Sequence, residues 1–219
     1  MAAIEWDKTG EHFYETGVNH AVLFPYDATN KTYGKGVAWN GITSVSESPS
    51  GAEATALWAD NIKYLNLISK EEFGATVEAY TYPDEFAVLD GSAEIATGVQ
   101  IGQQNRGMFG LVYRTEVGND TEGTDLGYKI HIIYGAKATP SEKAYQTIND
   151  SPEAITFSWT LNTTPVAVEG FKETASLVID SRKVDGDKLK AFEKIIYGDT
   201  NADPRLPLPD EVALKFAQG

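Results

Sequence analysis

The sequence predicts a mostly β (α+β) protein in which two antiparallel sheets pack as a sandwich or flattened barrel, with one flanking α-helix, extended arms and a loop. Apolar and polar residues alternate with period two in eight stretches, which is typical of half-buried strands. Gly, Pro, Asn and Asp clusters separate these stretches, and helix-length patterns between them are too few for βαβ units. The 219 residues are enough to bury one core, so we expect a single domain over 1–219.

Alternation is strongest at 155–161, where Ile, Phe, Trp and Leu alternate with Thr and Ser. A second strand is expected at 128–134, with Lys129 and His131 on the face opposite its apolar residues. Weaker alternation predicts the remaining strands at 18–24, 36–45, 62–68, 75–82, 109–115 and 175–180.

One helix is predicted at about 186–197. Asp185 is suited to cap its first turn, Val184 and Leu189 occupy the positions of a hydrophobic staple, and Gly198 ends the run. Apolar residues recur on one face of this helix, which we expect to pack on a sheet. Shorter helical segments are expected at 84–89 and 210–216.

Three segments lack the pattern of a core element. They are an N-terminal arm at 1–17, a long inter-strand loop of small residues at about 46–56, and a C-terminal tail at 198–219 that begins with a proline-rich stretch. Arms and long loops of this kind usually bind a partner or move.

The chain carries 32 acidic and 18 basic residues, a net charge of −14. Stable binding of DNA draws on clustered Lys and Arg, and no such cluster occurs, so a DNA-binding module is disfavoured. The acidic residues are interpreted either as a solvated surface or as a surface that must let a polyanion pass without holding it. Neither a signal peptide nor an apolar run long enough to cross a bilayer is expected, and the default location is a cytoplasm.

Catalytic motifs are not found. His12, His20 and His131 are interpreted as ordinary strand or surface histidines, and no nucleophile elbow or phosphate loop accompanies them. We therefore expect no enzyme activity, no metal and no cofactor. The 32 acidic residues do not exclude a catalytic carboxylate pair and nominate none, which leaves a glycoside hydrolase open as a third interpretation.

The spacing of four polar residues suggests a calcium-binding loop, but a proline at a key position argues against it. Asp199, Asn201, Asp203 and Asp210 stand at the offsets of EF-hand ligands. The position that needs a glycine with positive φ is Pro204, whose ring fixes φ near −65°. Calcium binding at this loop is therefore not expected.

Five blocks of sequence, taken together, resemble the major tail proteins of long-tailed, non-contractile bacteriophages, which are tail-tube subunits. The blocks are Lys-Gly-Val-Ala-Trp-Asn-Gly-Ile-Thr-Ser-Val at 35–45 with 47–55, then 59–67, 73–86, 149–159 and 177–198. The resemblance implies packed β-sheets with a flanking helix, hexameric rings stacked into a tube, and a bore through which DNA passes without specific binding. It also implies a tape-measure protein, tail terminator and distal tail proteins as partners, and a location in the virion tail after assembly in the host cytoplasm.

Candidate site residues follow from this resemblance. Loop 46–56 is expected to reach the next ring, and the arm and tail to lock neighbouring subunits. The candidates for contacts between subunits are Trp6, Phe13, Glu47, Pro49, Gly51, Glu53 and Trp58, and the candidate acids of the bore are Glu71, Glu72 and Glu78. The alternative is a carbohydrate-binding β-sandwich, for which Tyr80, Tyr82 and Phe86 would form an aromatic platform.

Overall fold

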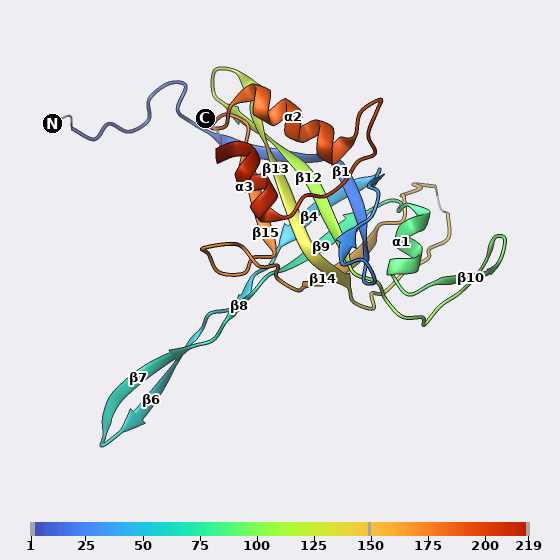
Figure 1. Cartoon of the computed structure of the whole chain (residues 1–219), viewed down its shortest axis with the longest axis horizontal. Helices are drawn as coiled ribbons and strands as arrows, with labels where there is room; N and C mark the ends of the chain where they lie inside the picture. The colour runs from blue at the N-terminus through green and yellow to red at the C-terminus, as the bar shows by residue number, and fades with distance from the viewer. Residues whose placement is uncertain (1–2, 149, 218–219) are drawn as a thin grey trace.

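The computed structural model describes residues 3–148 and 150–217 and confirms the mostly β class (Figure 1). The helices are α1 (Asp84–Leu89), α2 (Gly186–Tyr197) and α3 (Pro209–Ala217). The strands are β1 (Tyr14–Asp27), β2 (Thr32–Tyr33), β3 (Val37–Ala38), β4 (Ile42–Glu47), β5 (Ser50–Gly51), β6 (Ala54–Ala59), β7 (Ile62–Ile68), β8 (Glu71–Glu72), β9 (Gly74–Ala79), β10 (Ala93–Ala96), β11 (Val99–Ile101), β12 (Phe109–Asn119), β13 (Gly123–Ala138), β14 (Phe157–Thr163) and β15 (Ser176–Asp180).

The large sheet is antiparallel and runs in the order β2-β1-β12-β13-β14-β9-β4. The long strand β13 pairs with β15 through its middle and with β14 through its end, while β3 pairs with β1. Both layers of the expected sandwich therefore belong to one curled sheet, which does not close into a barrel over the described residues. The middle strands carry long apolar runs because both of their faces are covered.

Two hydrophobic cores lie on the two faces of this sheet. The first is enclosed by the curl, where residues of β1, β12 and β13 meet those of β4, β9 and β14 together with α1. Trp159 is 1% exposed at its centre and meets Trp39 and Phe86 in tilted or edge-to-face contacts. Its indole Nε1 donates to the buried carboxylate of Asp90, 3.3 Å away. A buried N–H thereby finds an acceptor, as burial of a polar group requires.

The second core lies under α2 and α3, which cover the other face of the sheet (Figure 1). The Asp185 side chain accepts hydrogen bonds from the amides of Asp187 and Lys188, which caps α2 as the sequence predicts. Leu189, Phe192 and Ile196 are buried against the sheet. Gly198, with φ at +79°, follows the last turn.

One part of the chain leaves the body of the molecule. The strands β5, β6, β7 and β8 form a long antiparallel hairpin that projects away from the large sheet (Figure 1). The expectation of a loop at 46–56 is therefore wrong, because this stretch ends β4 and then forms one limb of the hairpin. The strand expected at 62–68 exists, but it pairs with β6 and takes no part in the large sheet. We name residues 48–73 the projecting hairpin, and its base, β5 with β8, the neck.

A smaller hairpin, β10 with β11, was not expected from the sequence. Its residues alternate over only three or four positions, which is too short for a pattern to stand out. None of the helices in the described part of the chain is long and apolar enough to span a membrane.

Candidate functional site

The projecting hairpin pairs its two strands in regular register except for one bulge. Leu57 lies opposite Leu65, and Thr55 lies opposite Leu67, so these side chains share one face. A register shift follows Leu57, and Trp58 is paired with Lys63. A bulge of this kind bends and twists the ribbon.

The hairpin carries large apolar side chains that are exposed to solvent. Exposed fractions reach 69% for Trp58 and 68% for Tyr64, and the other exposed apolar residues are Leu57, Ile62, Leu65, Leu67 and Ile68. A two-stranded ribbon is at best marginally stable in water, and a contiguous apolar patch on a soluble protein usually marks an interaction site. The hairpin thus has the chemistry of a surface that is buried by a partner.

The neck joins this hairpin to the body through two pairs of residues on β5 and β8. Ser50 pairs with Glu72, and Gly51 pairs with Glu71. Gly51 has φ at +82°, and a β-carbon there would collide with the carbonyl oxygen of Lys70. The neighbouring contact candidates Pro49 and Glu53 are exposed beside the neck.

The N-terminal arm is tied down at one point. The amide of Gly10 donates to both carboxylate oxygens of Asp120, at 3.0 and 3.1 Å, and Asn119 Nδ2 donates to the Gly10 carbonyl. Contact with His12, together with these amides, lowers the pKa of Asp120 to about 2. The arm is thereby anchored to the β12–β13 turn, and β1 begins at Tyr14, so 14–17 belong to the sheet and not to the expected arm.

The two aromatic candidates of the arm stand on either side of this anchor. Trp6 precedes it and is 76% exposed. Phe13 follows it and lies 5.5 Å beneath the guanidinium carbon of Arg182, a cation–π contact, while remaining 58% exposed. Both residues are available on the surface of the isolated chain.

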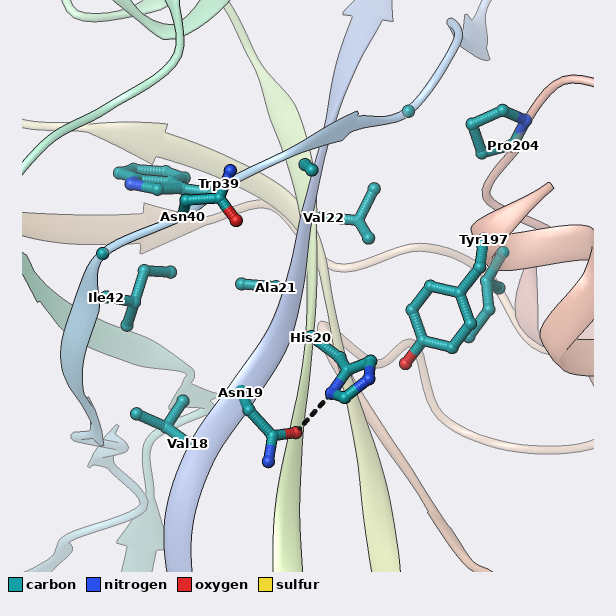
Figure 2. A pocket seen from close by; sticks show the side chains of 14 residues that line it. Val18, Asn19, His20, Ala21, Val22, Trp39, Asn40, Ile42, Tyr197 and Pro204 are labelled. Atoms are coloured by element: carbon teal, nitrogen blue, oxygen red, sulfur yellow. Dashed lines mark hydrogen bonds between the residues drawn. The ribbon is translucent and has the colours of Figure 1, made fainter.

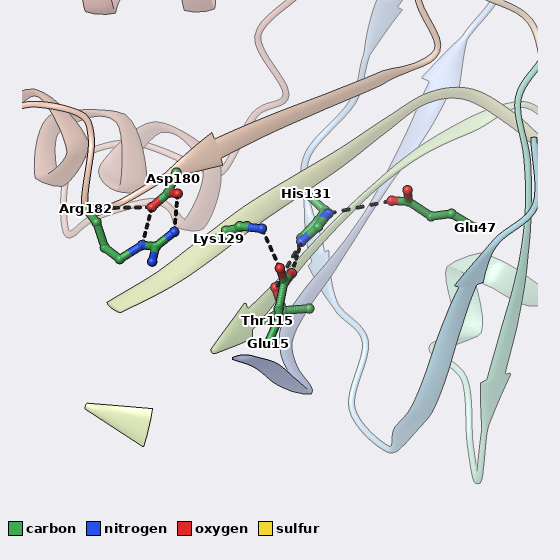
Figure 3. A network of polar contacts seen from close by, with 7 residues as sticks. All are labelled: Glu15, Glu47, Thr115, Lys129, His131, Asp180 and Arg182. Atoms are coloured by element: carbon green, nitrogen blue, oxygen red, sulfur yellow. Dashed lines mark hydrogen bonds and ion pairs between the residues drawn. The ribbon is translucent and has the colours of Figure 1, made fainter. Parts of the chain in front are cut away.

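Glu47, the remaining contact candidate, is exposed and makes contacts within its own chain. It accepts a hydrogen bond of 2.6 Å from the hydroxyl of Tyr113, and its carboxylate lies 3.6 Å from His131 Nδ1 (Figure 3). The contact with His131 lowers the pKa of Glu47 against the opposing effect of burial. On the other side of the imidazole, burial raises the pKa of Glu15, but hydrogen bonds from Lys129 and Thr115 outweigh it and lower the pKa.

The candidate bore acids fall in two places. Glu71 and Glu72 are exposed in the neck, whereas Glu78 lies on β9 and accepts a 2.9 Å hydrogen bond from Ser44. Alternate residues of β9 and β14 are buried in the first core, so Glu78 points to the outer face of the sheet. Its neighbours on that face are small and hydroxylated: Ser44, Ser46, Thr76, Ser158 and Thr160.

A pocket of about 530 Å³ lies between β1, the β3–β4 corner and the end of α2 (Figure 2). His20, whose φ is +52°, contacts the Asn19 side chain at 2.7 Å and lies beside the ring of Tyr197. Burial lowers the pKa of His20 and raises that of Tyr197 to about 12. The histidine thus meets an amide and a phenol, which does not assemble a nucleophile with its base.

The aromatic platform expected for the sugar-binding alternative is not formed. Phe86 is fully buried, and Tyr82 packs against the first core in contact with Phe86 and Trp159. Only Tyr80 of the three is exposed. The alternation at 75–82 made them appear as one surface, but α1 starts after Pro83 and turns Phe86 inward.

The acids with EF-hand spacing have separate partners. The Asp199 carboxylate accepts from the amides of Asn201 and Ala202, which closes a local turn. Asp203 pairs with Lys35 at 2.7 Å, and Asp210 accepts from the amide of Glu169. These carboxylates serve the local fold around α2 and α3.

Several exposed apolar residues of the structure were not among the candidates. They include Ile62, Tyr64 and Leu67 of the hairpin, Ile95 and Val99 of the β10–β11 hairpin, and Tyr145 and Ile148 in the irregular segment after β13. The alternation at 62–68 was the available signal, but it predicted a half-buried strand and gave no sign that both faces lie in solvent.

Comparison with known proteins adds little to this geometry. No protein-family model matches the chain, and no curated protein matches it. Among solved structures, a chain of the sheath–tube complex of the extracellular contractile injection system PVC, in its extended state, matches with 12% identity over 81% of this chain and 94% of that chain. The TM-score is 0.32, which does not establish a common fold.

Proposed function

We propose that this chain is a structural subunit that assembles with copies of itself into hexameric rings, and that the rings stack into the tail tube of a long-tailed bacteriophage. The observation that carries the proposal is the projecting hairpin, whose large apolar side chains are exposed on a ribbon too thin to bury them. The five sequence blocks that resemble major tail proteins support the same function. The tube serves as a conduit for genome delivery.

Contacts between rings are assigned to the projecting hairpin. Identical subunits joined head to tail form a closed ring or an open stack, and each needs a donor and an acceptor surface on every copy. The hairpin is a donor that leaves the body of its own subunit (Figure 1). Inserted against the next ring, it would bury Trp58 and the leucines at 57, 65 and 67, with Glu71 and Glu72 at the junction.

Contacts within a ring are assigned to the arm and to open strand edges. The anchor at Gly10 leaves residues 3–9 beyond it, with Trp6 exposed for a neighbouring subunit. Within the part of the chain that the structure describes, β4 pairs with β9 alone and β15 with β13 alone. Unpaired edges of this kind are suited to pairing with another chain.

The bore is assigned to the outer face of β4, β9 and β14. This face presents serine and threonine hydroxyls around Glu78. A polar surface with an acid and without a cluster of cations does not neutralise phosphates, so DNA gains no binding energy from counterion release there. The resemblance further places a tape-measure protein in the bore, and tail terminator and distal tail proteins at the two ends.

Electron microscopy of the purified full chain tests the proposal. Hollow tubes or six-membered rings are expected at high protein concentration. A persistent monomer would contradict the proposal, and glycan binding by that monomer would favour the carbohydrate-binding class.

A paired set of variants assigns stacking to the hairpin. Replacement of Leu57 and Leu65 by Asp is expected to abolish tubes, because both side chains lie on one hairpin face, while circular dichroism and the melting temperature of the body stay unchanged. Lys63→Gln on the same ribbon is the matched control and is expected to form tubes. Tubes of normal length from the double variant would show that this face does not stack rings.

A further inference from the structure

His131 lies between two carboxylates that come from different strands (Figure 3). Its Nε2 is 3.3 Å from Glu15 Oε1 and 2.9 Å from Thr115 Oγ1, and its Nδ1 is 3.6 Å from Glu47 Oε1. The side chain is 13% exposed, and the ring is stacked on Tyr113 with the planes 4° apart. Burial and stacking therefore fix the direction in which each ring nitrogen points.

The two carboxylates belong to β1 and β4, two strands of the large sheet that do not pair with each other. Glu15 is the second residue of β1, which pairs with β2, β3 and β12. Glu47 is the last residue of β4, which pairs with β9. The N-terminal arm precedes Glu15 directly, and the projecting hairpin follows Glu47 directly.

We propose that His131 is a proton-dependent link that fastens the start of β1 to the end of β4, and with them the arm to the neck of the projecting hairpin. A neutral imidazole carries one N–H and can donate on one side only, whereas an imidazolium donates on both sides. Only the charged form therefore bridges Glu15 and Glu47. The proposal does not depend on assembly into a tube.

The other polar groups around His131 are consistent with this role. Lys129 donates to Glu15, and the Tyr113 hydroxyl donates to Glu47, so each carboxylate keeps a partner of its own when the imidazole is neutral. On the side of β15, Asp180 and Arg182 are paired with each other. His131 is thus the group that touches both carboxylates. Its Nδ1 makes no hydrogen bond within the described residues, so the 3.6 Å contact with Glu47 is an ion pair that requires the charged imidazole.

The consequence is local loosening as the pH rises. When His131 loses its proton, one of its two contacts is lost and the two segments are held only by their separate partners. Residues 14–16 and 46–48 are then expected to open more often, while α2, on the other face of the sheet, is unaffected.

Hydrogen–deuterium exchange of the full chain, followed by mass spectrometry, measures this opening. Labelling times are scaled at each pH to the intrinsic exchange rate, and peptides covering 12–18 and 44–50 are compared with a reference peptide in α2. The expected result is a several-fold increase in relative exchange of both peptides as the pH rises from 5 to 8. Relative exchange that does not change with pH would overturn the proposal.

Variants separate the link from a general effect of pH. His131→Gln is expected to exchange rapidly at both ends of the pH range and to lose the response, whereas His20→Gln, on the other side of β1, is expected to retain it. Glu47→Gln keeps an acceptor for Tyr113 but removes one charge, so the peptide at 44–50 should lose its response. A His131→Gln or Glu47→Gln protein that is folded by circular dichroism and still shows the full response would contradict the role of the link.

Discussion

The α-carbon of Gly51 faces the carbonyl oxygen of Lys70 across the neck so closely that a β-carbon has no room there. β5 and β8 are paired over only two positions, and Gly51 belongs to one of these pairs. The contact therefore lies at the point where the hairpin leaves the body. The φ of +82° at Gly51 is also one that side chains with a β-carbon rarely adopt. Gly51 therefore constrains the backbone of the neck at the point where the hairpin leaves the body.

Gly51→Ala is expected to displace the hairpin without unfolding the body. The collision and the positive φ together disfavour the native neck by about 1–3 kcal/mol, but the neck shares no residue with either core. Tube formation should fall, while the melting temperature of the body stays within experimental error. Gly98→Ala, which also has a positive φ but has open space around it, is the matched control and should assemble normally.

A second prediction concerns the contribution of Glu47 to the stability of the fold at low pH. The folded-state pKa of Glu47 is lowered, so its contacts stabilise the fold above its ordinary value of about 4.5, and this contribution is lost as the pH falls through the lowered value. Glu47→Gln is expected to lose about 1 kcal/mol at neutral pH, the usual net worth of such a contact. Urea unfolding at pH 7 and at pH 3 should show a smaller difference between variant and parent at pH 3. An equal difference at both values would contradict the assignment.

Phe192→Ala tests whether the second core holds α2 on the sheet. The side chain is fully buried among residues of α2, α3 and the sheet, and its truncation is expected to destabilise the protein by about 3–5 kcal/mol. Phe171→Ala is the matched control because that side chain is 83% exposed, and its effect should stay within about 0.5 kcal/mol. Thermal unfolding by calorimetry measures both, and similar losses would contradict the packing described for α2.

Asp90→Ala is expected to be among the most disruptive single changes in the first core. The carboxylate is buried and receives Lys143 Nζ at 2.9 Å as well as the indole of Trp159. Arg106 Nη2 also lies 3.5 Å from this carboxylate, so its removal leaves two partly buried cations and a buried N–H without their acceptor, a loss of about 3 kcal/mol. The irregular segment that carries Lys143 should also become more open to proteolysis.

A control for this change is available on the surface. Glu153→Ala removes an exposed carboxylate from the same irregular region and should leave both the melting temperature and the cleavage rate unchanged. Equal sensitivity of the two variants to protease would show that Asp90 does not anchor the segment.

Most of the large sheet and helix α2 could be predicted from local sequence patterns. Alternation located most strands of the large sheet, and the cap at Asp185 with Gly198 located α2, because these signals depend on neighbours in the sequence. Alternation missed β2, and the single strand expected at 36–45 is divided into β3 and β4. The projecting hairpin was misread at 46–56 because its small residues resemble a loop. Its strands are defined by pairing with 62–72 and not by burial, which is the property that alternation reports.

The polar contacts around His131 join residues that are far apart in the sequence, and a local sequence pattern gives no information on such contacts. His131 was read as an ordinary strand or surface histidine, and Glu47 as a contact between subunits, yet the fold places both with Tyr113 in one cluster. These three residues are 18 or more positions apart in the sequence and meet only because β12, β13 and the end of β4 converge. Trp6 and Trp58 are exposed, and their role as contacts between subunits stays a prediction.

The exposed ribbon and the net charge of −14 act in opposite directions on a free subunit. Apolar side chains on the hairpin favour contact with a second copy, while the excess of acidic residues keeps copies apart at long range. Salt weakens the second effect much more than the first, since it shortens the distance over which charges repel to about 8 Å at physiological ionic strength. For the proposed self-assembly, we therefore expect that a higher ionic strength lowers the concentration at which separate chains begin to associate.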